Sequence, residues 1–106
     1  MSGLVRVLLY NLADDEAGIE AAYHKVSTEL ARVPGLLGNE LLRSVHNPRA
    51  FLVLSTWRDR AAFDGWEQGT AHKGDTAPLR PYRDVANPNV LGIFERLAVH
   101  DAEEAP

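Results

Sequence analysis

The 106-residue sequence contains no cysteine, which excludes disulfides, cysteine nucleophiles, iron–sulfur clusters and thiolate metal sites. No apolar run approaches the ~18 residues of a membrane span, so we expect no membrane association. The first residues lead straight into a strand-like segment, without a basic region or a small-residue cleavage site. We therefore expect no signal peptide and a cytoplasmic protein.

Basic residues are in the minority, with 11 Lys and Arg against 15 Asp and Glu. A nucleic acid partner normally requires a basic stripe, and the sequence shows none. Also missing are an H-E-x-x-H motif, a glycine-rich loop after a strand, and G-x-S-x-G. We therefore predict no metal site, no nucleic acid partner and no nucleotide or flavin site of the usual kind.

The length and the 45% hydrophobic content predict one domain over residues 1–106, with its core at about 4–99 and a frayed tail at 100–106. Residues 4–11 are apolar on both faces, a pattern typical of a covered strand. Residues 15–33 follow a capping acid and stop at Pro34-Gly35, which predicts a helix. Its apolar stripe consists of Ile19, Tyr23, Val26, Leu30 and Val33.

A hairpin is predicted next, with strands at 36–45 and 50–57 joined by an Asn-Pro turn at 46–49. Asp59 can cap a second helix that ends near Gly69. The first hairpin strand is expected to carry Leu37, Leu41 and Val45 on one face and Leu42 on the other. The second helix is expected to bury Ala62, Phe63 and Trp66.

The remaining chain predicts a short irregular helix and a loop over residues 70–88, then a last strand at 89–99. The order β-α-β-β-α-β indicates a ferredoxin-like α+β fold, a four-stranded antiparallel sheet with both helices on one face. Three of the strands are apolar on both faces, yet two helices cover only one. We therefore expect a homodimer, in which a second copy covers the open face.

Four motifs stand out along the chain. They are Val33-Pro34-Gly35-Leu36-Leu37-Gly38-x-x-Leu41-Leu42-Arg43-Ser44, Phe51-Leu52-Val53-Leu54-Ser55-Thr56-Trp57, Ala62-Phe63-x-x-Trp66 and Gly69-Thr70-Ala71-His72-Lys73. Together these motifs are similar to the antibiotic biosynthesis monooxygenase (ABM) domain family. The resemblance implies a subunit that pairs into a dimeric α+β barrel, with a pocket between its helices and its sheet.

The resemblance implies an enzyme, and two activities occur among such proteins. Some members oxidise polyketide anthrones to quinones with O2 and no cofactor, which implies a monooxygenase of antibiotic or secondary-metabolite biosynthesis. Others degrade haem with an Asn, a Trp and an iron-ligating His, and Asn11, Trp66 and His72 hold comparable places here. A non-oxidative polyketide cyclase or small-molecule binding protein on the same fold stays an open alternative.

A cofactor-free oxygenase needs an apolar pocket, a base and hydrogen-bond donors for the substrate oxygen. His72 is the best candidate base, because histidine titrates near neutral pH. Trp66 can form a pocket wall, and Asn11 can offer a buried amide to the substrate. Each also has a plain structural interpretation, as a loop histidine, a core tryptophan and a strand-end turn residue. Further candidates for substrate binding are Tyr82, Arg80, Phe63 and Tyr23, with Arg83 beside them.

Overall fold

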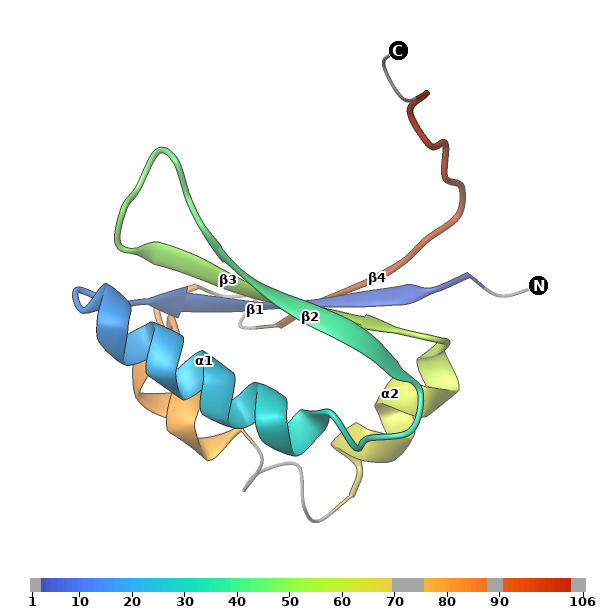
Figure 1. Ribbon diagram of the computed structural model, residues 1–106, viewed down its shortest axis with the longest axis horizontal. Helices are drawn as coiled ribbons and strands as arrows, with labels where there is room; N and C mark the ends of the chain where they lie inside the picture. Colours follow the sequence, from blue (N-terminus) through green and yellow to red (C-terminus); the bar gives the residue numbers. More distant parts are fainter. Residues whose placement is uncertain (1–2, 70–75, 88–90, 104–106) are drawn as a thin grey trace.

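The computed structural model describes residues 3–69, 76–87 and 91–103. Four strands form one antiparallel sheet in the order β2-β3-β1-β4, and the helices lie together on one face of it (Figure 1). This arrangement confirms the predicted ferredoxin-like α+β fold. The elements are β1 (Val5–Leu12), α1 (Glu16–Leu30), β2 (Leu36–Arg43), β3 (Ala50–Trp57), α2 (Arg60–Glu67), the 3-10 helix η1 (Ala77–Tyr82) and β4 (Leu91–Glu95).

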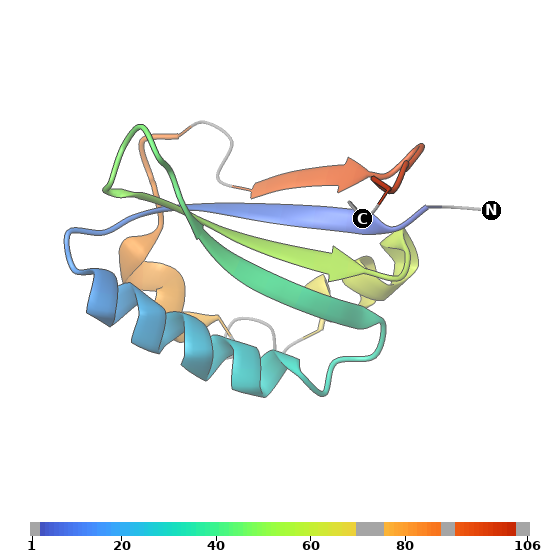
Figure 2. The same ribbon diagram turned by 45° about the horizontal axis from the view of Figure 1, so that its top comes forward.

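The helices cover the sheet unevenly. Figure 2 shows β2 and β4 at the two edges of the sheet, with α1 running beneath the β2 side. The shorter α2 lies at the end of the sheet where β3 stops, and η1 packs beside α1. No helix within the described ranges is long and apolar enough to cross a membrane.

The core consists of two neighbouring clusters. One is built mainly by α1, β3 and η1 and includes Ile19 and Leu79, both almost fully buried. The other lies under α2, where Trp57 and Phe63 are each 1% exposed and meet edge to face at 5.5 Å. The predicted cap of α2 is confirmed, because Asp59 accepts a hydrogen bond from the Ala62 amide at 2.8 Å.

The first hairpin strand differs from its prediction. The register shifts between Leu36 and Gly38, so that Leu36 packs against the core and Leu37 is 58% exposed. Val45 lies beyond the end of β2 and is 92% exposed. The expectation that Leu37 and Val45 share a face with Leu41 was therefore wrong. The bulge breaks the two-residue alternation at Leu37, and Val45 follows the last residue of the strand.

Two predicted boundaries also change. α1 ends at Leu30 rather than at residue 33, although Val33 still packs against both core clusters. Within the described residues β4 covers Leu91–Glu95 only, so the predicted strand extends too far at its C-terminal end. Residues 89 and 90 lie outside the described ranges.

Gly35 sets the close approach of β2 to α2. It has φ +87, a conformation that residues with a side chain rarely adopt. A Cβ at this position would lie 2.4 Å from the Ala62 Cβ atom. The Gly35 carbonyl also accepts a 2.7 Å hydrogen bond from the Arg58 amide. These contacts fix the start of β2 at the N-terminal end of α2.

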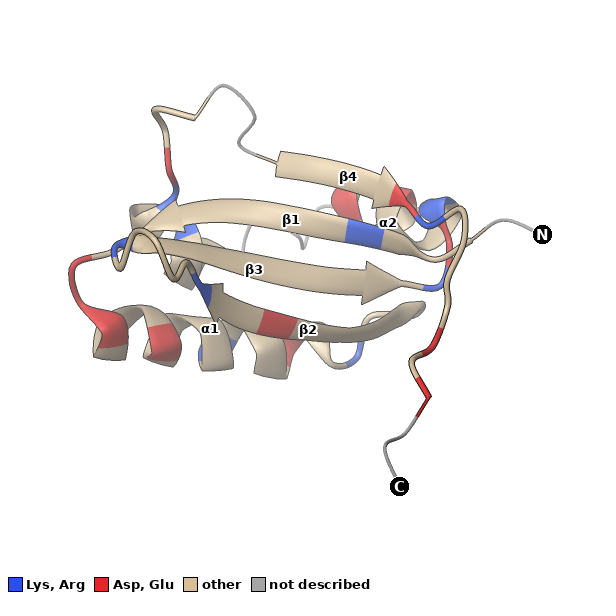
Figure 3. Cartoon of the chain, turned by 90° about the horizontal axis from the view of Figure 1, so that it is seen from above, with Lys and Arg blue, Asp and Glu red and all other residues tan. Residues whose placement is uncertain are grey.

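The sheet face away from the helices is apolar and open. Figure 3 looks onto this face, and few positions along its strands are charged. Leu42 of β2 is 41% exposed and Phe94 of β4 is 57% exposed. Between them, on the central strands, lie the half-buried Leu8, Tyr10, Leu52 and Leu54. As expected, the helices leave this second apolar surface uncovered.

Candidate functional site

A cavity of about 270 Å³ lies between the sheet and the helices. Small-molecule sites usually begin at about 300 Å³, so this volume suits a compact ligand. The aliphatic part of its wall comes from α1, η1 and the inner faces of the strands. It consists of Val7, Leu9, Val26, Leu30, Val53, Leu79 and Leu91.

Aromatic side chains line the α2 end of the cavity. Trp66 lies 5.5 Å from Trp57 and 6.1 Å from Phe63, measured between ring centroids. All three line the cavity, so the structure brings together two of the predicted site residues, Trp66 and Phe63. Flat, apolar walls of this kind suit an aromatic ligand.

Two polar side chains are neighbours on the part of the sheet that lines the cavity. Asn39 of β2 and Ser55 of β3 are direct partners in the strand register, and both line the cavity. Tyr23 of α1 donates its hydroxyl to Asn39 Oδ1 at 2.6 Å. Sequence reasoning missed Asn39 and Ser55, because only the strand pairing places them side by side. A polar residue in a largely apolar strand was the one signal available.

The proline-rich segment contributes Arg83 rather than Arg80. Arg83, Thr76 and Glu67 line the cavity. Arg80 and Arg83 are both exposed, but Arg80 is not part of the lining. Tyr82 is half-buried and packs against the first core cluster. Its hydroxyl approaches Gly18 of α1 instead of the cavity. Tyr23 likewise acts on the cavity through Asn39 and is not in its lining.

Asn11 is buried but is not part of the cavity lining. Its side chain is 2% exposed, and Nδ2 donates to the Leu9 carbonyl at 2.9 Å. Its Oδ1 has no hydrogen-bond partner, an arrangement that costs free energy unless something satisfies it. His72 lies outside the described residues, so its place relative to Asn11 and Trp66 stays a prediction.

Electrostatic interactions are concentrated away from the cavity. On α2, the side-chain hydrogen bond from Arg60 to Asp64 raises the pKa of the guanidinium, and neither residue lines the cavity. The described part of the chain has no group of three or more His, Cys, Asp and Glu side chains placed to hold a metal ion.

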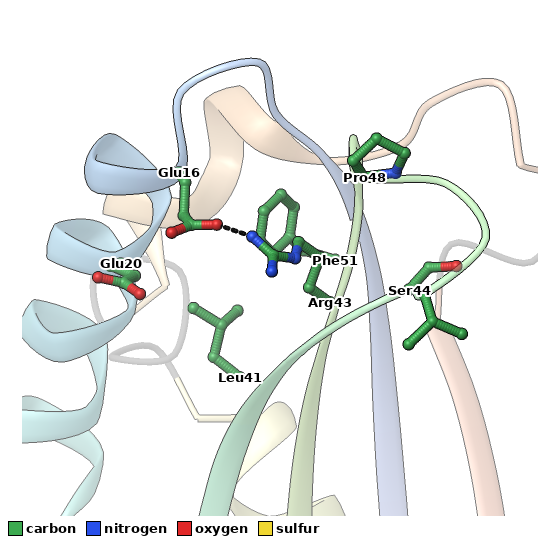
Figure 4. A pocket seen from close by; sticks show the side chains of 8 residues that line it. Glu16, Glu20, Leu41, Arg43, Ser44, Pro48 and Phe51 are labelled. Atoms are coloured by element: carbon green, nitrogen blue, oxygen red, sulfur yellow. Dashed lines mark hydrogen bonds and ion pairs between the residues drawn. The ribbon is translucent and has the colours of Figure 1, made fainter.

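A second hollow of about 710 Å³ lies between the start of α1 and the β2–β3 hairpin (Figure 4). Glu16 and Arg43 face each other across it and form an ion pair. Both side chains are more than half exposed, and exposed pairs of this kind contribute little stability. The hollow lacks the enclosing aromatic wall, so the cavity beneath the sheet is the better candidate site.

Comparison with known proteins identifies the family of the chain. The family model for antibiotic biosynthesis monooxygenases matches residues 10–74. Protein SchA of Streptomyces halstedii is 32% identical over 77 residues, which cover 72% of this chain and 20% of that protein. A 42.8 kDa protein in the whiE locus of Streptomyces coelicolor is 33% identical over 58 residues, 55% of this chain and 15% of that protein. The chain thus matches a fifth or less of the length of these curated relatives.

The fold is shared with solved structures. SnoaB, a cofactor-independent oxygenase from Streptomyces nogalater, superposes with a TM-score of 0.72 over 98% of this chain and 100% of that one. The two sequences are 17% identical, so the similarity speaks for the fold. The family match over residues 10–74, more than half of the chain, shows that the protein belongs to the antibiotic biosynthesis monooxygenase family.

Proposed function

We propose that the protein is a cofactor-independent monooxygenase that oxidises a polycyclic aromatic substrate of the anthrone type with O2 in secondary-metabolite biosynthesis. The observation that carries the proposal is the cavity under the sheet, whose wall is aliphatic and aromatic with few polar side chains. Family membership and the similarity to SnoaB support the same activity.

The chemistry requires the protein to make the substrate electron-rich. Triplet O2 does not react readily with a closed-shell molecule, but an enolate can give it one electron. The protein must remove a proton from the anthrone CH2 group, stabilise the resulting enolate oxygen and exclude water. The CH2 group and O2 are then converted to a carbonyl and one water molecule. Trp66 and Phe63 would hold the flat ring system during these steps.

The proton and charge roles fall to polar residues around the cavity. In this proposal His72 accepts the proton, and the unpartnered Oδ1 of the buried Asn11 is an acceptor for a donor group of the bound substrate. Of the two candidate arginines, Arg83 lines the cavity and Arg80 does not. The positive charge of Arg83 would stabilise an enolate oxygen. The proposal needs no flavin, haem or metal.

Anthrone oxidation tests the proposal. Metal-free protein is mixed with an anthrone in air-saturated buffer, and quinone formation and O2 uptake are followed together. We expect formation above the buffer rate, with a clear loss in Trp66→Ala. Glu29→Ala, an exposed position of α1, should match the wild type. No acceleration, or anthrone binding without O2 uptake, would contradict the proposal and favour a cyclase or a binding protein.

We also propose that the active form is a homodimer. The open sheet face exposes Phe94 and Leu42 beside a half-buried apolar centre, and surfaces of this kind usually mark an interface. A second copy is the simplest cover, because a two-fold interface needs only one self-complementary patch. Sedimentation at micromolar concentration should show a dimer, and a monomer alone would contradict this part of the proposal.

A further inference from the structure

We propose that Asn39 and Ser55 form a pair of hydrogen-bond donors that binds one acceptor oxygen, a carbonyl or an enolate, of an aromatic ligand in the cavity. The inference rests on the proposed function and deepens it, because it names the polar group that the site recognises. It predicts that the site distinguishes an aromatic ketone from a hydrocarbon of the same shape.

The strand register places the two side chains together. Asn39 and Ser55 are opposite each other in the antiparallel β2–β3 pair, where Cβ atoms of partners lie about 5 Å apart on the same face. That face is the inner one, since Asn39 contacts Tyr23 and Ser27 of α1. Both partners line the cavity.

The contacts of Asn39 leave its amide NH2 group unused. Tyr23 donates its hydroxyl to Oδ1 at 2.6 Å, with the Asn39 backbone carbonyl as a second, longer acceptor at 3.1 Å. Ser27 donates to the same Oδ1 at 3.2 Å, so both contacts of the side chain fall on its oxygen. The 2.6 Å distance lies in the range of O–H···O bonds and below that of N–H···O bonds, so the atom facing Tyr23 is the oxygen. No described residue accepts a hydrogen bond from Nδ2. The two hydroxyls therefore hold the amide oxygen toward α1 and leave the NH2 group available to another acceptor.

Ser55 is also left with a donor. Its Oγ accepts a 2.9 Å hydrogen bond from Trp57 Nε1, and an indole can only donate. The hydroxyl hydrogen of Ser55 therefore remains available, with no acceptor among the described residues. The carboxylate of Glu67 lines the same cavity but bonds to neither residue.

The NH2 group of Asn39 and the hydroxyl hydrogen of Ser55 both lack an acceptor within the described ranges, and their chemistry defines the ligand. Both are donors in a mostly apolar cavity, where an acceptor oxygen gains most from a hydrogen bond. A ketone oxygen fits, and it gains further when deprotonation of the neighbouring carbon moves negative charge onto it. Tyr23 and Ser27 are then positioning residues, because they orient the Asn39 amide without being part of the cavity lining.

Binding of two matched probes tests the inference without any turnover. 9-Fluorenone and fluorene share one flat framework, and only the ketone carries an acceptor oxygen. Affinities are measured on the full chain by quenching of tryptophan fluorescence, since Trp57 and Trp66 line the cavity. Infrared difference spectra follow the carbonyl stretch of bound fluorenone. The wild type should prefer fluorenone and lower its carbonyl frequency.

Two substitutions remove the donors one at a time. Asn39→Asp keeps an oxygen for Tyr23 and Ser27 but loses the NH2 group, and Ser55→Ala loses the hydroxyl. Each should weaken fluorenone binding about three- to tenfold, return the carbonyl frequency toward its free value and leave fluorene affinity unchanged. Glu29→Gln, an exposed change on α1 outside the cavity lining, should behave as wild type.

Several results would overturn the inference. Equal wild-type affinity for both probes would do so, as would an equal loss of fluorene and fluorenone binding in the variants, which indicates altered packing. If Asn39→Asp does not fold, Ser55→Ala still tests the inference through its fluorenone affinity and the carbonyl frequency of bound fluorenone. A protein that distinguishes the probes but does not oxidise anthrone would refute the proposed function and leave this inference intact.

Discussion

Trp57 at the end of β3 and Trp66 on α2 lie 5.5 Å apart between ring centroids, with their planes inclined by 31°. Trp57 is 1% exposed, whereas Trp66 is only half-buried. One aromatic contact therefore joins a fully buried residue to a half-buried one, and both line the cavity. The two positions should respond differently when each ring is removed.

Truncation of the two rings should lower stability by different amounts. Trp57→Ala removes a fully buried side chain and should lower the free energy of unfolding by about 3–5 kcal/mol. Trp66→Ala should cost less stability but abolish most binding of an aromatic ligand. Urea unfolding and fluorenone titration measure the two effects. A larger stability loss for Trp66→Ala than for Trp57→Ala would contradict the assignment.

The cap of α2 offers a matched pair of aspartates. Asp59→Ala removes the 2.8 Å hydrogen bond to the Ala62 amide and should destabilise the protein by about 1 kcal/mol. Asp15 occupies the same position on α1 without a side-chain hydrogen bond to the helix, so Asp15→Ala should cost less. Denaturant midpoints compare the two variants, and equal losses would argue against the capping bond.

Alanine substitution at two glycines should change the stability of the protein in opposite directions. Gly35→Ala places a Cβ 2.4 Å from Ala62 at a positive φ and should destabilise the protein by about 1–3 kcal/mol. Gly65 lies within α2 with open space around its Cβ position. Gly65→Ala should stabilise by about 1 kcal/mol. Thermal unfolding of both variants checks the signs, and a harmless Gly35→Ala would refute the close packing.

The open sheet face predicts a variant that separates subunits without unfolding them. Phe94→Glu puts a charge on an apolar side chain that is 57% exposed, so the isolated fold should tolerate it while the dimer dissociates. Val85→Glu adds the same charge at an exposed site outside the sheet and should leave the dimer intact. Sedimentation velocity distinguishes them. An unchanged dimer in Phe94→Glu would place the interface elsewhere.

Much of the fold follows from local sequence patterns. The Asn-Pro turn and the apolar run after it predict β3 with its observed bounds, Ala50–Trp57. In the predicted helix stripe Ile19, Val26 and Leu30 are buried, and Tyr23 packs partly buried against the same core. The bulge at Leu37 escaped prediction, because a register shift depends on the partner strand rather than on residue types.

The site was predictable only in part, for a related reason. Trp66 and Phe63 line the cavity because one helix face carries both, and helical spacing shows this in the sequence. The pairing of Asn39 with Ser55 depends on the strand register, which joins positions 16 residues apart. The choice of Arg83 over Arg80 depends on how the chain leaves η1, a detail that composition does not contain.

Labelled oxygen tests the central claim, that an aromatic substrate is oxidised by O2 within the cavity under the sheet. Anthrone is incubated with the metal-free protein under ¹⁸O2, and the quinone is analysed by mass spectrometry for the wild type and Leu91→Trp, which fills the cavity from β4. The account predicts rapid wild-type formation of quinone with one ¹⁸O atom, and slow formation by the filled variant. Quinone formation at the buffer rate, or equally fast oxidation by Leu91→Trp, would contradict it.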